Sequence, residues 1–414
     1  MLKNYLKIAL KVLLRRKFFT FVSLFGVSFT LVVLMVATAI VDHTFAPLAP
    51  EVNQDRTVSI TRASMFGDRS TWNSAAGYRL LDQYARNLPG AEATSFFSSP
   101  DQVYSYPHGT KVRILLKRTD SEFWRILRFA FIEGAPYTAD DVSAARPMAV
   151  ISRSTRERLG LGQTAVGQTI DVDGQRFRVV GVVEDVARLR FIPFGEMWAP
   201  FTTVKSDSYK ADLLGGFNAI VLARDMRAIP VMQDEFKSRL ARAELPDPKR
   251  YRKLVAPLES TFEGVARMMF GSVRDESSHV ERLWMLMAGA ALLFMLLPTV
   301  NLVNLNISRI MERASEIGVR KAFGASSRTL VGQFVVENLV LTGVGCVVGL
   351  VASVLVLHGI NASGLIPYAD LRLNYRIFFY GLSLALFFGL FSGVYPAWRM
   401  SRLNPVEALK GTGR

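Results

Sequence analysis

The chain has 414 residues, half of them hydrophobic and 21% charged, with a formal net charge of +15. Apolar and charged residues in these proportions must be segregated along the chain, which predicts a membrane protein with a large soluble part. The basic excess does not indicate a nucleic-acid-binding protein, because it lies beside apolar runs and no nucleic-acid-binding motif accompanies it.

Four apolar runs are long enough to cross a bilayer, which takes roughly 20 helical residues. They lie at about residues 18–42, 283–307, 329–358 and 376–397. The first run exceeds the apolar region of a signal peptide and no cleavage site follows it, so we expect a retained anchor. Four crossings place both termini on the same side of the membrane.

The distribution of charge predicts which side is cytoplasmic. The segments before the first run, between the second and third, and after the fourth hold fifteen basic and three acidic residues, a net +12 of the chain's +15. By the positive-inside rule these segments face the cytoplasm. We therefore expect residues 1–42 to form a cytoplasmic N-terminus and transmembrane helix 1, and residues 43–257 to form an extracytoplasmic domain.

The predicted outer domain alternates between strand and helix patterns. In chain order, the patterns predict a strand at 56–62, a helix at 75–88, a strand at 111–118, a short helix at 154–161, a hairpin at 169–186, a strand at 217–224 and a helix at 229–243. Asp173 and Gly174 give the strongest hairpin signal in the chain. This order predicts an α+β core from about 45–110 and 216–257, with a strand-rich insertion at about 111–215.

Residues 258–282 have a helical pattern that runs into the second apolar run. We expect a helical stalk joining the outer domain to the membrane, with a flexible linker as the alternative. Only Gly264 and Gly271 interrupt the pattern, and no proline does.

The sequence offers no catalytic site. The histidines at 43, 108, 279 and 358 are scattered without an apparent metal-ligand spacing, and we expect no metal. There is no GxSxG nucleophile motif and no GxxxxGK[ST] phosphate-binding loop. We therefore expect neither an enzyme nor a cofactor in this chain. The only cysteine, Cys346, lies in the third apolar run, so the outer domain relies on its hydrophobic core rather than on disulfides.

The third apolar run carries an intramembrane polar group at Gln333, Glu337 and Asn338. An ionisable side chain inside a membrane is costly, so it indicates either a buried hydrogen-bond partner or an aqueous path. Both readings remain open for Glu337. Gly343, Gly345 and Gly349 on the same run predict close packing between spans or between subunits.

The charged segment 308–328 separates the second and third apolar runs. Ile310, Ala314 and Ile317 recur at helical spacing, Glu316 and Arg320 form a favourable i, i+4 pair, and Gly324 follows basic residues. These features predict a short amphipathic helix that ends at Gly324, with Ser326 or Ser327 capping the next helix.

The stretch ERASEIGVRKAFGASSRTLVGQFVVENLVL (312–341) resembles the inside loop and third span of ABC transporter permeases of the MacB/FtsX type. Its matching residues are Arg313, Glu316, Ile317, Gly318, Arg320, Lys321, Ala322, Gly324, Ala325, Gln333 and Glu337. The tail YPAWRMSRLNPVEALKG (395–411), the outer stretches 131–160 and 170–186, and the N-terminal stretch 5–27 are similar to the same family.

The resemblance implies a MacB-like periplasmic core in the outer domain and an FtsX-like permease region at 283–414, with transmembrane helices 2–4, a coupling loop at 308–328 and a cytoplasmic tail. It implies that Arg313, Glu316, Ile317, Gly318, Arg320, Lys321, Gly324 and Ala325 form the coupling helix on which a separate ABC ATPase subunit docks. ATP would then be the partner's ligand.

The same resemblance implies a homodimer or a heterodimer with a related permease, in contact with the lipids of the bacterial inner membrane. One implied function is export or efflux, with a periplasmic adaptor and an outer-membrane channel as further partners. The alternatives are a non-transporting mechanotransmitter that controls an envelope protein such as a cell-wall hydrolase, and a lipoprotein-release permease. The substrate is not readable from these residues.

Overall fold

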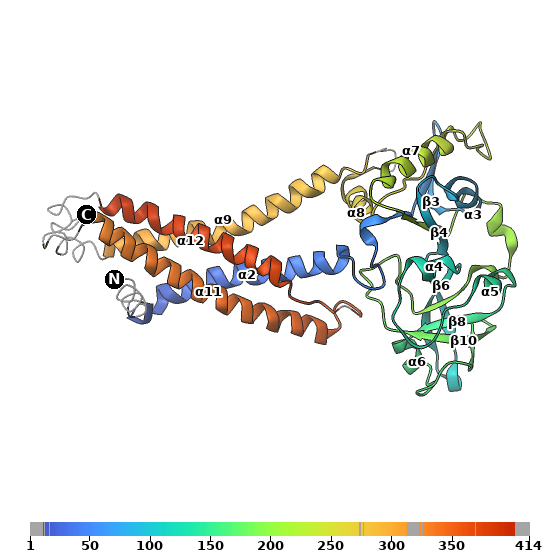
Figure 1. Ribbon diagram of the computed structural model, residues 1–414, viewed down its shortest axis with the longest axis horizontal. Coiled ribbons are helices and arrows are strands. Elements are labelled where there is room, and N and C mark those ends of the chain that lie inside the picture. Colours follow the sequence, from blue (N-terminus) through green and yellow to red (C-terminus); the bar gives the residue numbers. More distant parts are fainter. Residues whose placement is uncertain are drawn as a thin grey trace. The chain divides into compact units, whose positions relative to one another are not determined.

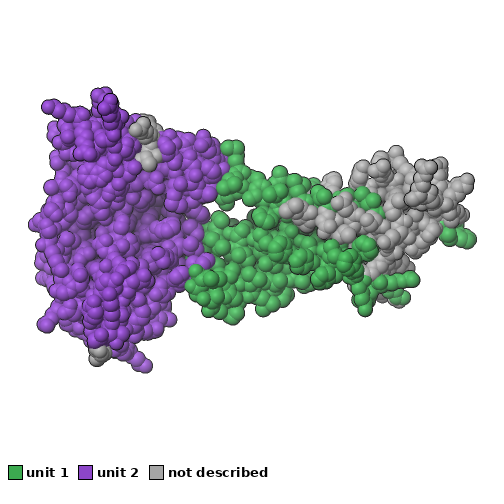
Figure 2. Space-filling model, turned by 180° about the vertical axis from the view of Figure 1, so that it is seen from behind, with its two compact units in different colours: residues 1–43, 285–365, 370–414 green, residues 44–284, 366–369 purple. Residues whose placement is uncertain are grey.

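The chain folds into two compact units (Figure 2). The computed structural model describes residues 11, 13–15, 17–272, 275, 277–312, 319, 323, 326–368 and 370–401. We call residues 1–43, 285–365 and 370–414 the membrane unit, and residues 44–284 and 366–369 the outer unit. The division falls within two residues of the boundaries expected at 42 and 282.

Long helices occupy all four predicted apolar runs (Figure 1). They are α2 (Lys17–Phe45), α9 (Val280–Glu312), α11 (Ser327–Ser363) and α12 (Tyr375–Ser401). Among the described residues, α2 and the part of α11 from Val331 are long and apolar enough to cross a membrane, and Tyr375–Phe387 of α12 is a shorter apolar helix. The large domain follows the first helix, as expected, and a crossing by all four helices stays a prediction.

Two glycines of α11 let this helix pack closely against α2. A Cβ atom on Gly345 would lie 2.9 Å from Val27 Cγ1, and one on Gly349 would lie 3.1 Å from Leu31 Cβ. Ser28 Oγ donates a hydrogen bond of 2.9 Å to the Gly345 carbonyl, which the missing side chain leaves accessible. The predicted close packing is therefore confirmed at Gly345 and Gly349, whereas Gly343 has no neighbour within 4 Å of its Cβ position.

A fourteen-stranded sheet is the main structure of the outer unit. Its hydrogen-bonded path runs β14-β2-β3-β13-β4-β6-β11-β8-β10-β7, with β1, β5, β9 and β12 paired beside it. The strands are β1 (Thr57–Ile60), β2 (Ala63–Phe66), β3 (Thr71–Ala76), β4 (Ala91–Ser98), β5 (Asp101–Ser105), β6 (Val112–Thr119), β7 (Phe131–Gly134), β8 (Met148–Ser152), β9 (Thr169–Val172), β10 (Gln175–Val183), β11 (Met197–Pro200), β12 (Leu214–Gly215), β13 (Phe217–Ala223) and β14 (Lys253–Val255).

Short helices connect these strands, and two longer ones cover the sheet near its β14 end. The helices are α3 (Tyr78–Leu80), which continues as the π-helix η2 (Leu81–Ala85), α4 (Glu122–Ile126), α5 (Ala139–Ser143), α6 (Arg153–Arg158), α7 (Ala228–Ala241) and α8 (Thr261–Phe270). The 3₁₀ turns are η1 (Gln54–Arg56), η3 (Pro107–Gly109), η4 (Phe201–Thr203) and η5 (Asp207–Lys210).

The sheet divides the apolar interior of the outer unit into two cores. Successive side chains of a strand point to opposite faces. On β11, accordingly, Trp198 packs in the larger core while Met197 and Ala199 pack in the smaller one. The smaller core draws its residues from 103–199, close to the expected insertion. Because strands such as β11 contribute to both cores, the insertion extends the central sheet and does not form a separate layer.

The predicted hairpin is confirmed, and the first predicted helix is shorter than expected. Asp173 and Gly174 take φ values of 52° and 69°, which a two-residue type I′ turn requires, and β9 pairs antiparallel with β10. The pattern at 75–88 predicted helix from its first residue. Ala75 and Ala76 instead pair with Gly215 and Leu214 in the sheet, so the helix begins only at Tyr78.

The prediction of one continuous helical stalk at 258–282 is wrong. Helix α8 starts at the capping box of Ser260 and Glu263 and ends at Gly271, whose ψ of 151° is extended. The described residues between Gly271 and Val280 are not helical. A Cβ at Gly271 would lie only 2.8 Å from the Arg267 carbonyl oxygen, so a close backbone approach, which only glycine permits, ends the helix there.

Gly345→Leu should destabilise the membrane unit, because the new side chain has no room beside Val27. Overpacking of this kind costs roughly 1–3 kcal/mol. The free energy of unfolding of the full chain, titrated with denaturing detergent in mixed micelles, measures the loss.

Gly343→Leu is the matched control, since it makes the same exchange on the same helix where nothing lies within 4 Å. It should change the unfolding free energy by less than about 0.5 kcal/mol. Equal losses in the two variants would contradict the packing of α11 against α2 through Gly345.

Candidate functional site

The residues of the predicted coupling helix lie outside the described part of the chain. These residues are Arg313, Glu316, Ile317, Gly318, Arg320, Lys321, Gly324 and Ala325. Their described neighbours are the end of α9 at Glu312 and the start of α11 at Ser327. Ser326 is the N-cap of α11, where its hydroxyl accepts a hydrogen bond of 3.2 Å from the Thr329 N–H, as one of the two predicted caps.

The three predicted intramembrane polar residues are all buried on α11. Gln333, Glu337 and Asn338 are each less than a tenth exposed. The Gln333 amide Nε2 donates a hydrogen bond of 3.0 Å to Glu337 Oε1, one helical turn away. A hydrogen bond within the helix reduces the cost of burying a polar side chain, which favours the structural reading of Glu337. Within the described residues, the Nδ2 atom of Asn338 has no hydrogen-bond partner.

Aromatic rings join the first and second long helices inside the outer unit. The ring of Phe45, the last residue of α2, lies 5.3 Å from that of Phe262 in an edge-on arrangement. On α8, Phe262 also lies 4.9 Å from the ring of Trp284 near the start of α9. Ring pairs at these distances are attractive beyond their buried area. Helix α8 thus contacts both helices at the points where they enter the outer unit.

A buried arginine holds the segment that follows α2. Arg190 forms an ion pair of 2.9 Å with Glu51, and both side chains are less than a tenth exposed. The same guanidinium donates to the carbonyl oxygens of Ala46 and Leu48 at 3.1 and 3.2 Å. Burial raises the pKa of Glu51 above its ordinary value, and Arg190 opposes that rise. Arg190 therefore binds the chain just after α2 through three groups at once.

A lysine lies in the same buried region without a direct carboxylate partner among the described residues. Lys117 of β6 is fully buried and donates hydrogen bonds to the carbonyl oxygens of Phe191 (3.2 Å) and Ile192. Its ammonium lies 5.1 Å from the centre of the Phe97 ring. Burial lowers the pKa of Lys117 to about 7, and the Glu51 charge opposes that shift. No pattern in the sequence marked this lysine, because alternation along a strand does not reveal which polar residue faces a core.

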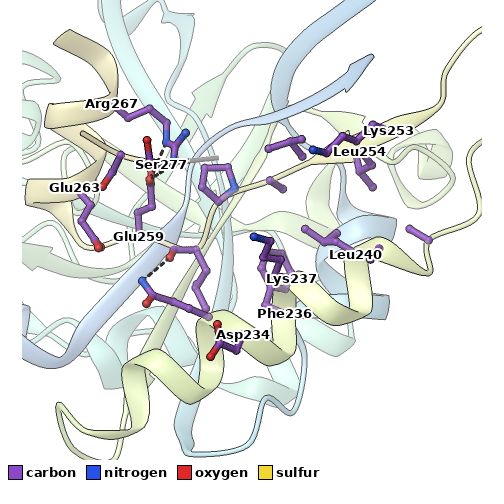
Figure 3. A pocket seen from close by; sticks show the side chains of 18 of the residues that line it. Asp234, Phe236, Lys237, Leu240, Lys253, Leu254, Glu259, Glu263, Arg267 and Ser277 are labelled. Carbon is purple, nitrogen blue, oxygen red and sulfur yellow. Dashed lines mark hydrogen bonds and ion pairs between the residues drawn. The ribbon is translucent and has the colours of Figure 1, made fainter. Parts of the chain in front are cut away.

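The outer unit also contains a groove with a cavity of about 600 Å³ (Figure 3). One wall is helix α7, and the opposite wall is β14 with the extended residues 256–259 that follow it. The start of α8 and residues 277–281 close one end. Phe236 and Leu240 of α7 and Leu254 of β14 form an apolar floor, since each is less than a tenth exposed.

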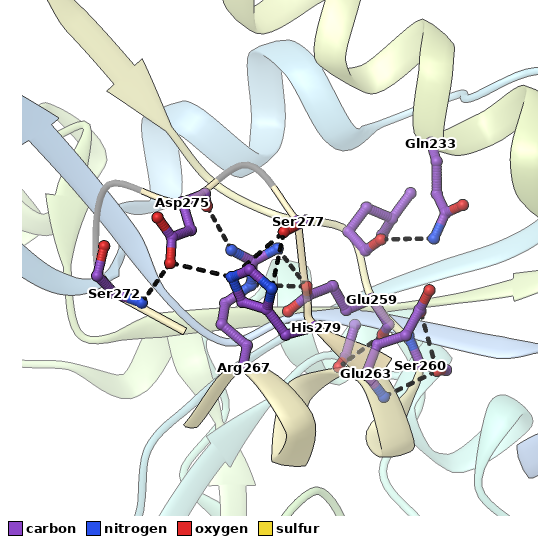
Figure 4. Close-up of polar contacts among 11 residues, drawn as sticks. Gln233, Glu259, Ser260, Glu263, Arg267, Ser272, Asp275, Ser277 and His279 are labelled. Carbon is purple, nitrogen blue, oxygen red and sulfur yellow. Dashed lines mark hydrogen bonds and ion pairs between the residues drawn. The ribbon is translucent and has the colours of Figure 1, made fainter. Parts of the chain in front are cut away.

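Paired polar groups form the α8 end of the groove (Figure 4). Arg267 makes two contacts of 2.7 Å with Glu259 Oε1, through Nε and Nη2, and it also donates to the Asp275 carbonyl oxygen. The Asp275 carboxylate accepts from the Ser272 N–H at 2.7 Å and contacts His279 Nε2 at 3.1 Å. The Ser272 N–H first, and His279 second, lower the pKa of Asp275.

His279 has a carboxylate partner, although no metal-ligand spacing marks the histidines in the sequence. Asp275 lies four residues before it, and the structure places the two side chains in contact. Among the described residues, no group of three or more His, Cys, Asp or Glu side chains gathers as a metal site would require. The described side chains of the groove form no catalytic constellation.

Comparison with known families identifies the chain. Residues 20–239 match the model of the MacB-like periplasmic core domain, which covers more than half of the chain. Residues 288–405 match the model of the FtsX-like permease C-terminal domain. The chain belongs to the MacB/FtsX-type ABC transporter permeases. Permeases of this type are membrane proteins with a periplasmic domain, and they work with ABC ATPase partners.

The individual relatives have low sequence identity to this chain. The uncharacterized ABC transporter permease YknZ of Bacillus subtilis is 21% identical over 82% of this chain and 81% of its own length. The macrolide export ATP-binding/permease protein MacB of Campylobacter fetus is 24% identical over 70% of this chain, which spans only 43% of that relative. The solved extracellular domain of the noncanonic ABC-type transporter YknZ from Gram-positive bacteria is 16% identical over 48% of this chain and 98% of its own, with a TM-score of 0.36.

The stability of the outer unit should rise with pH because of Lys117. The folded pKa is about 7 and the ordinary value is 10.5. Between these two values the unfolded chain binds a proton that the folded chain does not. The buried lysine therefore lowers the free energy of unfolding most below pH 7. Above pH 7 this free energy rises by up to about 1.4 kcal/mol per pH unit. Lys117→Met should remove this slope between pH 7 and 9, as measured by urea unfolding of the full chain in detergent.

Lys205→Met is the control, because it removes a lysine whose side chain is 63% exposed. It should keep the wild-type slope. If Lys117→Met also keeps that slope, Lys117 does not lose its proton in the folded outer unit.

Proposed function

We propose that this chain is the transmembrane permease subunit of an ABC transporter, and that it couples ATP hydrolysis by a separate ATPase subunit to motion of the outer unit. The proposal rests on one observation, that a single chain combines a MacB-like periplasmic core with an FtsX-like permease region. Permeases of this type work with ABC ATPase partners, which supports an ATPase partner here, and the 414 residues themselves contain no phosphate-binding loop.

The connections into the outer unit support a mechanical role. A helix transmits motion only if its end is held by the domain that it moves. Phe45 of α2 and Trp284 of α9 both contact Phe262, and Arg190 holds the residues that follow α2. Through these contacts, motion of either helix acts on the same part of the outer unit.

The proposed arrangement places the chain in the bacterial inner membrane with both termini in the cytoplasm and four membrane crossings. The coupling loop at 308–328 then faces the ATPase, and the permease works as a homodimer or with a related permease. The name of the Campylobacter fetus relative, a macrolide export protein, favours export. The further partners in this proposal are a periplasmic adaptor and an outer-membrane channel. The exported substrate is not specified by the described residues.

Ile317→Asp tests the coupling step. A charge at the apolar centre of the coupling helix should break its fit to the ATPase, since burying an unpaired charge in an interface is costly. We expect loss of ATPase co-purification and a fall of about tenfold or more in permease-stimulated ATP hydrolysis. Reversing both charges, in the double variant Glu316→Lys with Arg320→Glu, should also uncouple hydrolysis.

Leu365→Asp is the matched control, because it adds the same charge at a residue that is 76% exposed in the loop between α11 and α12. This loop is predicted to lie on the opposite side of the membrane. The control should leave ATPase binding intact. Unchanged binding and turnover in Ile317→Asp would refute the proposed coupling.

A further inference from the structure

Strand β14 is the end strand of the sheet. The hydrogen-bonded path stops at β14, which pairs antiparallel with β2 through Leu254 opposite Met65 and Val255 opposite Ser64. After β14 the chain stays extended and reaches Glu259, which exchanges two backbone hydrogen bonds of 2.7 and 2.9 Å with Ser59 of β1. An end strand directs one row of backbone groups away from its own sheet, where another extended chain can pair with it.

Helix α7 faces this border of the sheet across the groove. Gln233, Lys237, Leu240 and Ala241 recur at spacings of three and four, so they lie on one face of α7. Figure 3 shows Lys237 and Leu240 on this wall, with Lys253 and Leu254 of β14 on the other. The groove therefore has a strand edge on one side and a helix on the other, with an apolar floor between them.

The charges of the lining favour an uncharged occupant. Four carboxylate residues and four lysines or arginines line the groove, so their formal charges cancel. Several of them are bound to protein groups, since Arg267 pairs with Glu259, Arg252 pairs with Asp68, and Glu263 accepts from Ser260. A charged molecule would gain little from such a lining, whereas an apolar side chain would cover the apolar lining residues that are still partly exposed, Ala243, Leu245 and Val255.

We propose that the groove docks an extended, uncharged segment of a partner protein, which adds as a strand to β14 and places an apolar side chain on the floor. Addition of a strand supplies affinity through backbone hydrogen bonds and specificity through pockets for alternate side chains. The structure also limits the length of the segment that can pair with β14. Pro257 has no N–H to donate, and Gln233 Nε2 already donates 3.0 Å to the Leu258 carbonyl oxygen. Pairing therefore covers residues 253–256, a stretch of about 13 Å at strand spacing.

This site goes beyond the coupling of ATP hydrolysis and does not depend on it. The occupant is recognised on the outer unit alone, and its binding is measurable without an ATPase. Failure of either proposal leaves the other standing.

Ala241→Trp blocks the groove without changing the core, because Ala241 is exposed on α7 and lines the cavity. The probe is a library of random twelve-residue peptides displayed on phage, panned on the full chain in lipid nanodiscs and counter-selected on Ala241→Trp. Selected peptides are then synthesised with a fluorophore, and their binding is measured by anisotropy. Ala241→Trp should weaken binding about tenfold or more.

Arg242→Trp is the matched control, since Arg242 is the exposed C-cap residue of the same helix and does not line the groove. It should bind the selected peptides as the wild type does. Peptides N-methylated at alternate residues separate strand addition from simple filling of an apolar cavity, because they lose donors to β14 but keep their side chains. Methylation can begin at the first or at the second residue, and only one of these two patterns removes the N–H groups that donate to β14. The peptide with that pattern should lose binding.

Three results would overturn the proposal. The panning may yield no peptide that distinguishes wild type from Ala241→Trp, or both N-methylated patterns may bind as tightly as the parent peptide, which would indicate a small apolar ligand. The third result is a change of the full chain from dimer to monomer on Ala241→Trp, seen by light scattering after size exclusion. That change would show that a second copy of this chain occupies the groove.

Discussion

The proposed coupling depends on how the outer unit holds the ends of the two helices that enter it. Arg190 is the most constrained part of this attachment, because one buried guanidinium neutralises Glu51 and also binds two carbonyl oxygens just beyond α2. Breaking a buried ion pair by removing one partner is strongly destabilising. Arg190 therefore holds the segment after α2 in the outer unit, while Phe262 contacts both the end of α2 and the start of α9. In the proposed coupling, these contacts pass motion of either helix to the outer unit.

The break between α8 and α9 changes the mechanical picture. A continuous helix would act as a single rod, but the chain turns at Gly271, and paired side chains carry the connection instead. Arg267 binds Glu259 and the Asp275 carbonyl oxygen, and Asp275 contacts His279 one residue before α9. These polar contacts form a joint between α8 and the start of α9. The groove lies beside this joint, so that Glu259 and Arg267 belong to both.

Much of the fold was predictable because local patterns decided it. The hairpin at Asp173 and Gly174 followed from turn chemistry, and the four long helices followed from the length of their apolar runs. The stalk was predicted wrongly because its pattern is helical throughout, and only a close backbone approach at Gly271 ends the helix. Lys117 and the groove were missed for a different reason. Both depend on tertiary contacts that no single segment encodes, since Lys117 meets Ile192 from far along the chain and the groove forms only where α7, β14 and α8 come together. The coupling residues around Ile317 rest on the family pattern alone.

Hydrogen–deuterium exchange of the permease bound to its ATPase, compared between the ATP-bound and ADP-bound states, tests the central claim most directly. The account predicts that exchange changes with the nucleotide in residues 44–51 and 261–284, where the long helices are held, and stays constant in the β9–β10 hairpin at the distant part of the sheet path. Changes confined to the membrane unit, with none at either attachment, would contradict transmission of ATP-driven motion to the outer unit.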